Sequence, residues 1–185
     1  MEDKTGLKIV VKIIYWKNKT AVEMACSVLN NGGVIVYPTD TLYGFGCDAK
    51  NESAIKKINT IKGRKTPMSV LAPNKEIAAK WMNIPKHDKN NVLEKLGGLI
   101  TIIVPVKVGI TSPSITGDKQ TLGIRIPDHN FCQKLSKTYP NPITTTSVNR
   151  TRQEPLTNPE NILSEFSREI DLIIEDGIIE GSGST

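Results

Sequence analysis

Polar side chains that could bind an anionic substrate recur at separated places in this 185-residue chain. Thr39 and Thr41 flank an aspartate just after an apolar, β-branched run that ends at Pro38. Gly44 and Gly46 follow, so we expect a polar loop in which glycines let the backbone approach a ligand at the end of a strand. An ordinary turn rich in Gly and Thr is the other interpretation, and composition alone favours it.

A second polar group lies at the end of an expected helix, where Lys62 and Arg64 flank Gly63. An arginine binds phosphate oxygens in bidentate fashion and a lysine adds a point charge, so these residues could hold a triphosphate. The same residue types are common at helix C-termini. Taken by itself, this segment favours the capping role.

Three further polar groups lie near expected strands and at the end of the chain. Arg125 interrupts an apolar strand, and a buried charge there needs either a carboxylate ligand or an internal Asp or Glu. Ser147 and Asn149 are two residues apart and share a face, where they could bind substrate or satisfy nearby backbone groups. The last group is the Ser-Gly-Ser-Thr segment at 182–185.

Regular elements are expected between these groups, from hydrophobic periodicity and from capping residues. Asn51 or Ser53 should cap the second helix, Asp128 the helix that runs to about Lys137, and Pro159 should start the last one. The expected strands cover residues 8–15, 34–37, 68–72, 99–106, 121–127, 143–148 and 171–174, the expected helices cover 20–30, 54–61, 75–82, 88–96, 129–137 and 159–166, and 108–119 is expected to be loop. This order predicts one α/β domain over residues 1–185, with a mixed sheet.

Composition limits the class of protein. Hydrophobic content of 38% and charged content of 23% are typical of a soluble globular domain. The sequence has neither an apolar run of about 18 residues nor an apolar signal-peptide core, which argues against a membrane location. Cys26, Cys47 and Cys132 are widely spaced, which predicts neither a disulfide framework nor structural zinc, and a reducing cytoplasm.

The net charge of +5 is unevenly distributed. Residues 160–185 contain seven acids and one arginine, so residues 1–159 carry a net charge of +11. A basic body suits an anionic partner, either a nucleotide or a nucleic acid. A solvated surface rich in lysine explains the same excess and accounts for most of these lysines.

Taken in order, the polar groups resemble the YrdC family of threonylcarbamoyl-AMP synthases over about residues 32–185. The motifs that carry the resemblance are Pro38-Thr39-Asp40-Thr41-Leu42-Tyr43-Gly44-Phe45-Gly46, Lys62-Gly63-Arg64, Gly123-Ile124-Arg125-Ile126-Pro127, Ser147-Val148-Asn149 and Ser184-Thr185. The resemblance implies a twisted, mixed parallel and antiparallel sheet with flanking helices and a basic central cavity.

The resemblance also implies a nucleotidyltransferase that joins L-threonine, bicarbonate and ATP into L-threonylcarbamoyl-AMP and releases pyrophosphate. This is the first step of the tRNA threonylcarbamoyladenosine modification, and a tRNA threonylcarbamoyl transferase would take the product. By resemblance, threonine would be bound by Thr41, Arg125, Ser147 and Ser184. ATP would be bound by Lys62, Arg64, Thr66, Thr121, Asn149 and Thr157. The residues expected to act in catalysis are Lys62, Arg64, Ser147 and Asn149.

In-line attack of a carbamate on the α-phosphate needs positioning and charge stabilisation rather than an enzyme nucleophile. Mg²⁺ would be held mainly by phosphates and water, with no metal site of the protein's own. His87 and His129 are expected at the surface or at helix caps, and Asp40 is expected to order its loop as an acceptor, not to act as a base.

The chain departs from the family pattern in three ways. Leu71 stands where relatives often carry a histidine that helps to bind threonine, and Arg150 and Thr151 follow the Ser-x-Asn motif. Relatives continue past the position of Thr185 into a further strand, so we expect a chain truncated at its C-terminus.

The alternative function is a module of the same fold that binds double-stranded RNA or tRNA without catalysis. The set of Lys62, Arg64, Ser147 and Asn149 favours the enzyme, because an RNA-binding module does not need it. Aromatic residues that could stack on bases make up only 5% of the chain, which also argues against the module. Weak binding of tRNA remains compatible with the enzyme.

Overall fold

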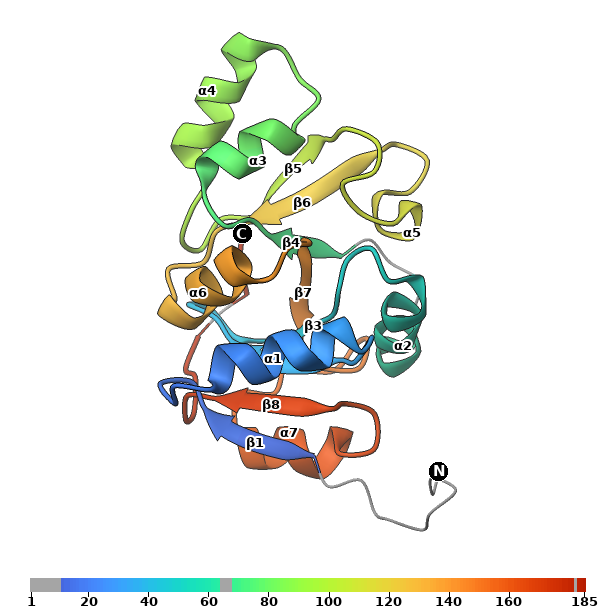
Figure 1. The fold of residues 1–185 in the computed structure, drawn as a ribbon, viewed down its shortest axis with the longest axis vertical. Coiled ribbons are helices and arrows are strands. Elements are labelled where there is room, and N and C mark those ends of the chain that lie inside the picture. Colours follow the sequence, from blue (N-terminus) through green and yellow to red (C-terminus); the bar gives the residue numbers. More distant parts are fainter. Residues whose placement is uncertain (1–10, 64–67, 182) are drawn as a thin grey trace.

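The computed structural model describes residues 11–63, 68–181 and 183–185, and it contains one eight-stranded sheet (Figure 1). The strands are β1 (Lys12–Tyr15), β2 (Ile35–Pro38), β3 (Tyr43–Gly46), β4 (Ser69–Leu71), β5 (Ile102–Pro105), β6 (Thr121–Arg125), β7 (Ile143–Ser147) and β8 (Leu172–Glu175). They lie in the order β1-β8-β2-β3-β7-β4-β6-β5. The pairs β1/β8, β8/β2 and β4/β6 are parallel and the other neighbouring pairs are antiparallel, which confirms the predicted mixed sheet.

Helices flank the sheet. They are α1 (Ala21–Asn30), α2 (Glu52–Lys62), α3 (Lys75–Trp81), α4 (Lys86–Lys95), α5 (Pro113–Thr116), α6 (Asn130–Thr138) and α7 (Pro159–Phe166). In Figure 1, α3, α4 and β5 lie at one end of the molecule, and β1, β8 and α7 at the other.

Alternation along β2 divides the core between the two faces of the sheet. Ile35 and Tyr37 pack in a cluster with residues of α1 and α6, whereas Val36 packs in a second cluster with residues of α2 and α7. Every residue of β2 and β3 is buried, which follows from having helices on both sides.

The second helix begins and ends as its residues predict. The Asn51 side chain accepts a hydrogen bond from the backbone N–H of Ala54 (3.0 Å), and Gly63 ends the helix in the left-handed conformation at φ 65°. Ile55, Ile58 and the other apolar residues of one face are buried. This helix positions Lys62 at its last turn.

The glycine-rich segment after Thr41 is a strand, not the predicted loop. Residues Tyr43–Gly46 form β3, which pairs antiparallel with β2 and β7. Gly44 and Gly46 are absent from the glycines with positive φ. A Cβ at Gly46 would lie 2.6 Å from Cε1 of Tyr37, so this glycine makes room for a buried ring across the pair.

Two smaller expectations are also wrong. The predicted loop at 108–119 contains α5, which begins with Pro113 at its first turn and is capped by the Ser112 side chain. The cap of α6 is His129, one residue after the predicted Asp128, and its ring nitrogen accepts from the N–H of Phe131. The backbone N–H of Asp128 donates to Asp40. Part of the first predicted strand, residues 8–10, lies outside the described residues.

The register of the central strands brings small and hydroxylated side chains together on one face. Ser69 of β4 is opposite Thr145 of β7 on one side and Gly123 of β6 on the other. Ser147, two residues after Thr145, is opposite Gly44 of β3. This strip of the sheet forms the floor of the site described next. Within the described ranges, no helix has the length and apolarity that a membrane span requires.

Candidate active site

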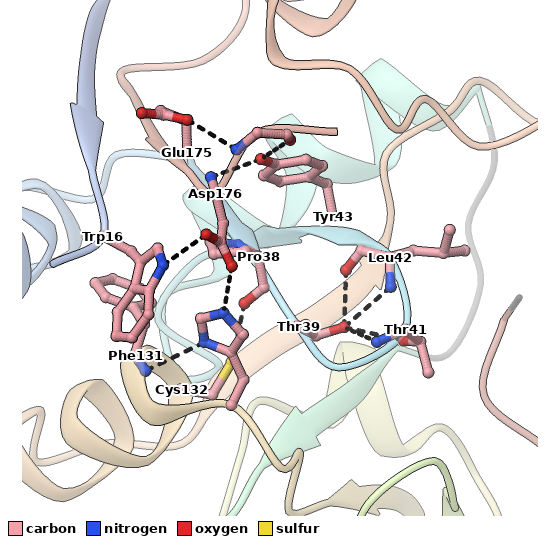
Figure 2. A network of polar contacts seen from close by, with 12 residues as sticks. Trp16, Pro38, Thr39, Thr41, Leu42, Tyr43, Phe131, Cys132, Glu175 and Asp176 are labelled. Atoms are coloured by element: carbon pink, nitrogen blue, oxygen red, sulfur yellow. Dashed lines mark hydrogen bonds and ion pairs between the residues drawn. The ribbon is translucent and has the colours of Figure 1, made fainter. Parts of the chain in front are cut away.

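The turn between β2 and β3 is organised by the Thr39 hydroxyl (Figure 2). Oγ1 of Thr39 accepts from the backbone N–H groups of Thr41 (3.1 Å) and Leu42 (3.2 Å) and donates to the carbonyl of Leu42 (2.7 Å). It also lies 2.9 Å from Oγ1 of Thr41. Both threonines are buried, so their hydroxyls are fixed by the turn itself.

Arg125, the last residue of β6, projects toward this turn and is held by an internal carboxylate. Its Nη2 donates to Oδ1 of Asp40 at 2.9 Å, and its Nη1 donates to Oγ1 of Thr41 at 3.3 Å. The two charged side chains are only 7% and 9% exposed. Of the two partners predicted for Arg125, a carboxylate ligand or an internal Asp or Glu, the structure contains the internal carboxylate of Asp40. The buried Nε of Arg125 has no acceptor among the described residues.

The exit of β7 is held by the ammonium group of Lys62. Its Nζ donates to the carbonyl of Ser147 (2.7 Å) and to the carbonyl (3.0 Å) and Oδ1 (2.7 Å) of Asn149. Asn149 Oδ1 also accepts from Oγ of Ser147 (2.7 Å), and its amide donates to the carbonyl of Gln153 (2.6 Å). The Ser-x-Asn motif thus forms a local turn, and the Lys62 side chain ties it to α2.

Tyr43 joins the site to the segment that follows β8. Its hydroxyl accepts from the backbone N–H of Asp176 (2.8 Å) and donates to the carbonyl of Gly177 (2.7 Å) (Figure 2). Burial raises the pKa of this phenol to about 12, against a lowering by the N–H of Asp176 and a smaller raising by the charge of Glu175. The neutral hydroxyl therefore persists at physiological pH.

The C-terminal segment reaches across to the residues before β5. Oγ of Ser184 lies 2.9 Å from Oγ1 of Thr101, and the backbone of Thr185 exchanges hydrogen bonds with Leu99 and Thr101. At Gly181 the segment approaches the turn so closely that an added Cβ would overlap the carbonyl oxygen of Thr41. These contacts bring Ser184 next to the turn and the sheet.

These parts line an open cavity of about 260 Å³. Its lining consists mostly of hydroxylated and small residues: Thr39, Thr41, Leu42, Tyr43, Gly44, Met68, Ser69, Arg125, Thr145, Thr146, Ser147, Gly183 and Ser184. Arg125 is the charged side chain among these described lining residues, and Asp40 pairs with it. A basic cavity stays a prediction, because Arg64 lies outside the described residues.

The structure brings together the four residues expected to bind threonine, since Thr41, Arg125, Ser147 and Ser184 all line this cavity. The residues expected at ATP are more dispersed. Lys62 and Asn149 are joined to Ser147, whereas Thr121 pairs with Pro105 at the start of β6 and the carbonyl of Thr157 accepts from Ile179 (3.1 Å). Neither Thr121 nor Thr157 is among the described lining residues, and Arg64 and Thr66 lie outside the described ranges.

Sequence reasoning missed several lining residues, among them Ser69 and Thr145. A hydroxyl inside a short apolar strand and the i, i+2 relation of Thr145 to Ser147 were the available signals. His87 is exposed and His129 caps α6, as expected. Leu71 is buried in the cluster with α1 and α6 residues. Across the described part of the chain, no three His, Cys, Asp or Glu side chains gather as a metal site.

Comparisons with known proteins agree with this fold. The family model Sua5_yciO_yrdC, described as "Telomere recombination", matches residues 27–185. A Methanocaldococcus jannaschii protein, provisionally named a threonylcarbamoyl-AMP synthase, is 34% identical over 178 residues, which cover 93% of this chain and 83% of the relative. The threonylcarbamoyl-AMP synthase of Photobacterium profundum is 29% identical over 163 residues, which cover 83% of this chain and 85% of the relative.

Solved structures show the same fold. A double variant of P. abyssi Sua5 superposes with a TM-score of 0.85 at 25% identity, covering 95% of this chain and 56% of the other, so this chain spans about half of that protein. E. coli YciO superposes with a TM-score of 0.84 at 22% identity, covering 95% and 87%. P. abyssi Sua5 complexed with L-threonine superposes with a TM-score of 0.84 at 24% identity, covering 95% and 53%. The family model and the 34% identical relative show that the chain belongs to the Sua5/YciO/YrdC family.

Proposed function

We propose that this chain synthesises L-threonylcarbamoyl-AMP from L-threonine, bicarbonate and ATP, with release of pyrophosphate. The observation that carries the proposal is the position of Thr41, Arg125, Ser147 and Ser184 on one cavity, although they come from separate segments of the chain. Relatives named threonylcarbamoyl-AMP synthase support it.

The cavity suits a small amino acid. Its volume of about 260 Å³ is below the roughly 300–1,000 Å³ that is common for sites of larger ligands. The buried guanidinium of Arg125, with Nε lacking an acceptor among the described residues, can receive the carboxylate of threonine. The hydroxyls of Thr41, Ser147 and Ser184 offer donors and acceptors for its amine and hydroxyl.

The chemistry requires positioning more than covalent catalysis. The threonine amine and bicarbonate form a carbamate and water, and a carbamate oxygen then attacks the α-phosphorus of ATP while the bond to pyrophosphate breaks. We assign Arg64 and Lys62 to stabilising charge on the phosphates, with Ser147 and Asn149 beside them, and Thr66, Thr121 and Thr157 to the rest of the nucleotide. Mg²⁺ would be bound by phosphate oxygens and water as it enters with ATP.

The same proposal covers the cellular context. A tRNA threonylcarbamoyl transferase would consume the adenylate, and tRNA would be at most a weak ligand of this chain. We place the protein in the cytoplasm, in keeping with its free cysteines Cys26, Cys47 and Cys132.

Pyrophosphate release tests the proposal against the RNA-binding alternative. The full chain is incubated with ATP, Mg²⁺, bicarbonate and L-threonine, and each component is omitted in turn. Release that requires all of them supports the enzyme, and Arg125→Ala should reduce it strongly whereas the exposed change Lys137→Ala should not. Salt-sensitive binding of double-stranded RNA without any release would support the module instead.

A further inference from the structure

We propose that Asp40 is a positioning residue that sets the orientation of Arg125 for the carboxylate of the amino-acid substrate. The inference rests on the proposed function, because it assigns to Arg125 the role of carboxylate receptor. Asp40 is outside the residues that line the cavity and acts through its neighbour.

The two oxygens of the Asp40 carboxylate contact the Arg125 side chain and the backbone that follows β6. Oδ1 accepts from Nη2 of Arg125 at 2.9 Å, and Oδ2 accepts from the backbone N–H of Asp128 at 2.7 Å. Since Asp128 is only three residues beyond Arg125, one carboxylate fixes both the guanidinium and the chain that leaves β6. Because its second oxygen is anchored to the backbone, the Asp40 carboxylate holds Nη2 of Arg125 from a fixed position.

The position of Asp40 is itself fixed by the turn on either side of it. The Thr39 hydroxyl makes four hydrogen bonds within the turn, and Oγ1 of Thr41 accepts from Nη1 of Arg125. The guanidinium is therefore held from two directions by consecutive residues. Its Nε is buried and has no acceptor among the described residues.

Because both side chains are buried, the orientation of the Arg125 guanidinium depends on its protein partners. Both side chains are at least nine-tenths buried, so solvent offers Arg125 little alternative hydration. A mobile guanidinium would have to be ordered again whenever a substrate binds, whereas a clamped one is already oriented. The competing expectation is that Asp40 occupies Arg125 and repels a second carboxylate, and removal of its charge would then tighten substrate binding.

The variant Asp40→Asn separates these expectations. The amide is isosteric, but it has one acceptor oxygen for two donors, so it cannot satisfy both Arg125 and Asp128. We expect the KM for L-threonine to rise about tenfold, as for the loss of one charge-assisted hydrogen bond. The KM for ATP should change little. The unfolding midpoint should fall, because the buried guanidinium of Arg125 loses its charged partner, and Asp40→Glu should restore part of both the midpoint and the threonine affinity.

A double-mutant cycle tests whether Asp40 acts through Arg125. In the Arg125→Ala background, Asp40→Asn should not weaken binding of L-threonine further, because the group that it positions is gone. Direct calorimetric binding of L-threonine, without ATP, keeps this result independent of turnover. An unchanged or tighter affinity in Asp40→Asn would overturn the inference, even where the unaltered chain makes the adenylate. A wild-type chain that binds threonine but releases no pyrophosphate would instead contradict the proposed function.

Discussion

The ammonium of Lys62 lies 2.7 Å from Oδ1 of Asn149, and this contact joins the end of α2 to the exit of β7. Lys62 is almost fully buried at 3% exposure, and it also binds the carbonyls of Ser147 and Asn149. The Lys62 side chain therefore supports the part of the cavity lining that includes Ser147.

Replacement of Lys62 by Met should destabilise the protein. The change leaves buried acceptors at Ser147 and Asn149 without their charged donor, which costs on the order of 1–3 kcal/mol of unfolding free energy. Denaturant unfolding measures this loss. The matched control is Lys57→Met, because Lys57 donates to the carbonyl of Gly32 at an exposed position. Equal stability of the two variants would contradict this account of Lys62.

Replacement of Arg64 by Ala should lower turnover at least about tenfold, since one lost charge-assisted contact at the phosphates costs about 1.5–3 kcal/mol. Pyrophosphate release at saturating ATP and threonine provides the measurement. Arg168→Ala, at an exposed position two residues after the end of α7, serves as the charge-matched control. Unchanged turnover in Arg64→Ala would remove this residue from the site.

Replacement of Tyr43 by Phe should weaken the attachment of the segment after β8 and change the alkaline stability. The folded chain raises the pKa of Tyr43 to about 12, compared with about 10 in an unfolded chain. Folding favours the neutral phenol, so its contribution to stability is complete below pH 10 and is lost as the pH rises from about 10 to about 12.

The difference in unfolding free energy between wild type and Tyr43→Phe should therefore shrink across that interval. Taking the difference cancels the titration of the other tyrosines. A difference that stays constant from pH 8 to pH 12 would show that Tyr43 does not titrate with folding.

Replacement of Gly181 by Ala should impair use of threonine. The added methyl group would overlap the carbonyl oxygen of Thr41, so the segment bearing Ser184 must move away from the cavity. We expect a several-fold rise in the KM for threonine and little change in the KM for ATP. Glu180→Ala, next to it and exposed, is the control. Identical kinetics of the two variants would mean that the close approach at Gly181 has no role in the site.

Local signals in the sequence predicted most of the elements because caps and apolar periodicity are encoded in neighbouring residues. Asn51 and Gly63 delimit α2 as expected. The pairing of Gly44 and Gly46 with β2, and of Gly44 with β7, was not predicted, since the reason for a glycine at position 46 is the buried ring of Tyr37 on the neighbouring strand. Likewise, the isolated charge of Arg125 predicted a partner, but only the fold identifies it as Asp40.

The same distinction holds for the site. Motif order brought Thr41, Arg125, Ser147 and Ser184 into one hypothesis, and the cavity confirms that they are neighbours. Ser69 and Thr145 were not predicted as cavity residues, because their place in the lining depends on strand register. The register sets them opposite each other on β4 and β7.

The most direct test of the central claim is detection of the adenylate itself. The full chain is incubated with ATP, Mg²⁺, ¹³C-labelled bicarbonate and L-threonine, and the products are analysed at once by mass spectrometry. The account predicts a threonylcarbamoyl-AMP species that carries the labelled carbon, is absent without threonine, and is strongly reduced in Arg125→Ala. Consumption of ATP without any such species, or no reaction while threonine is bound, would contradict it.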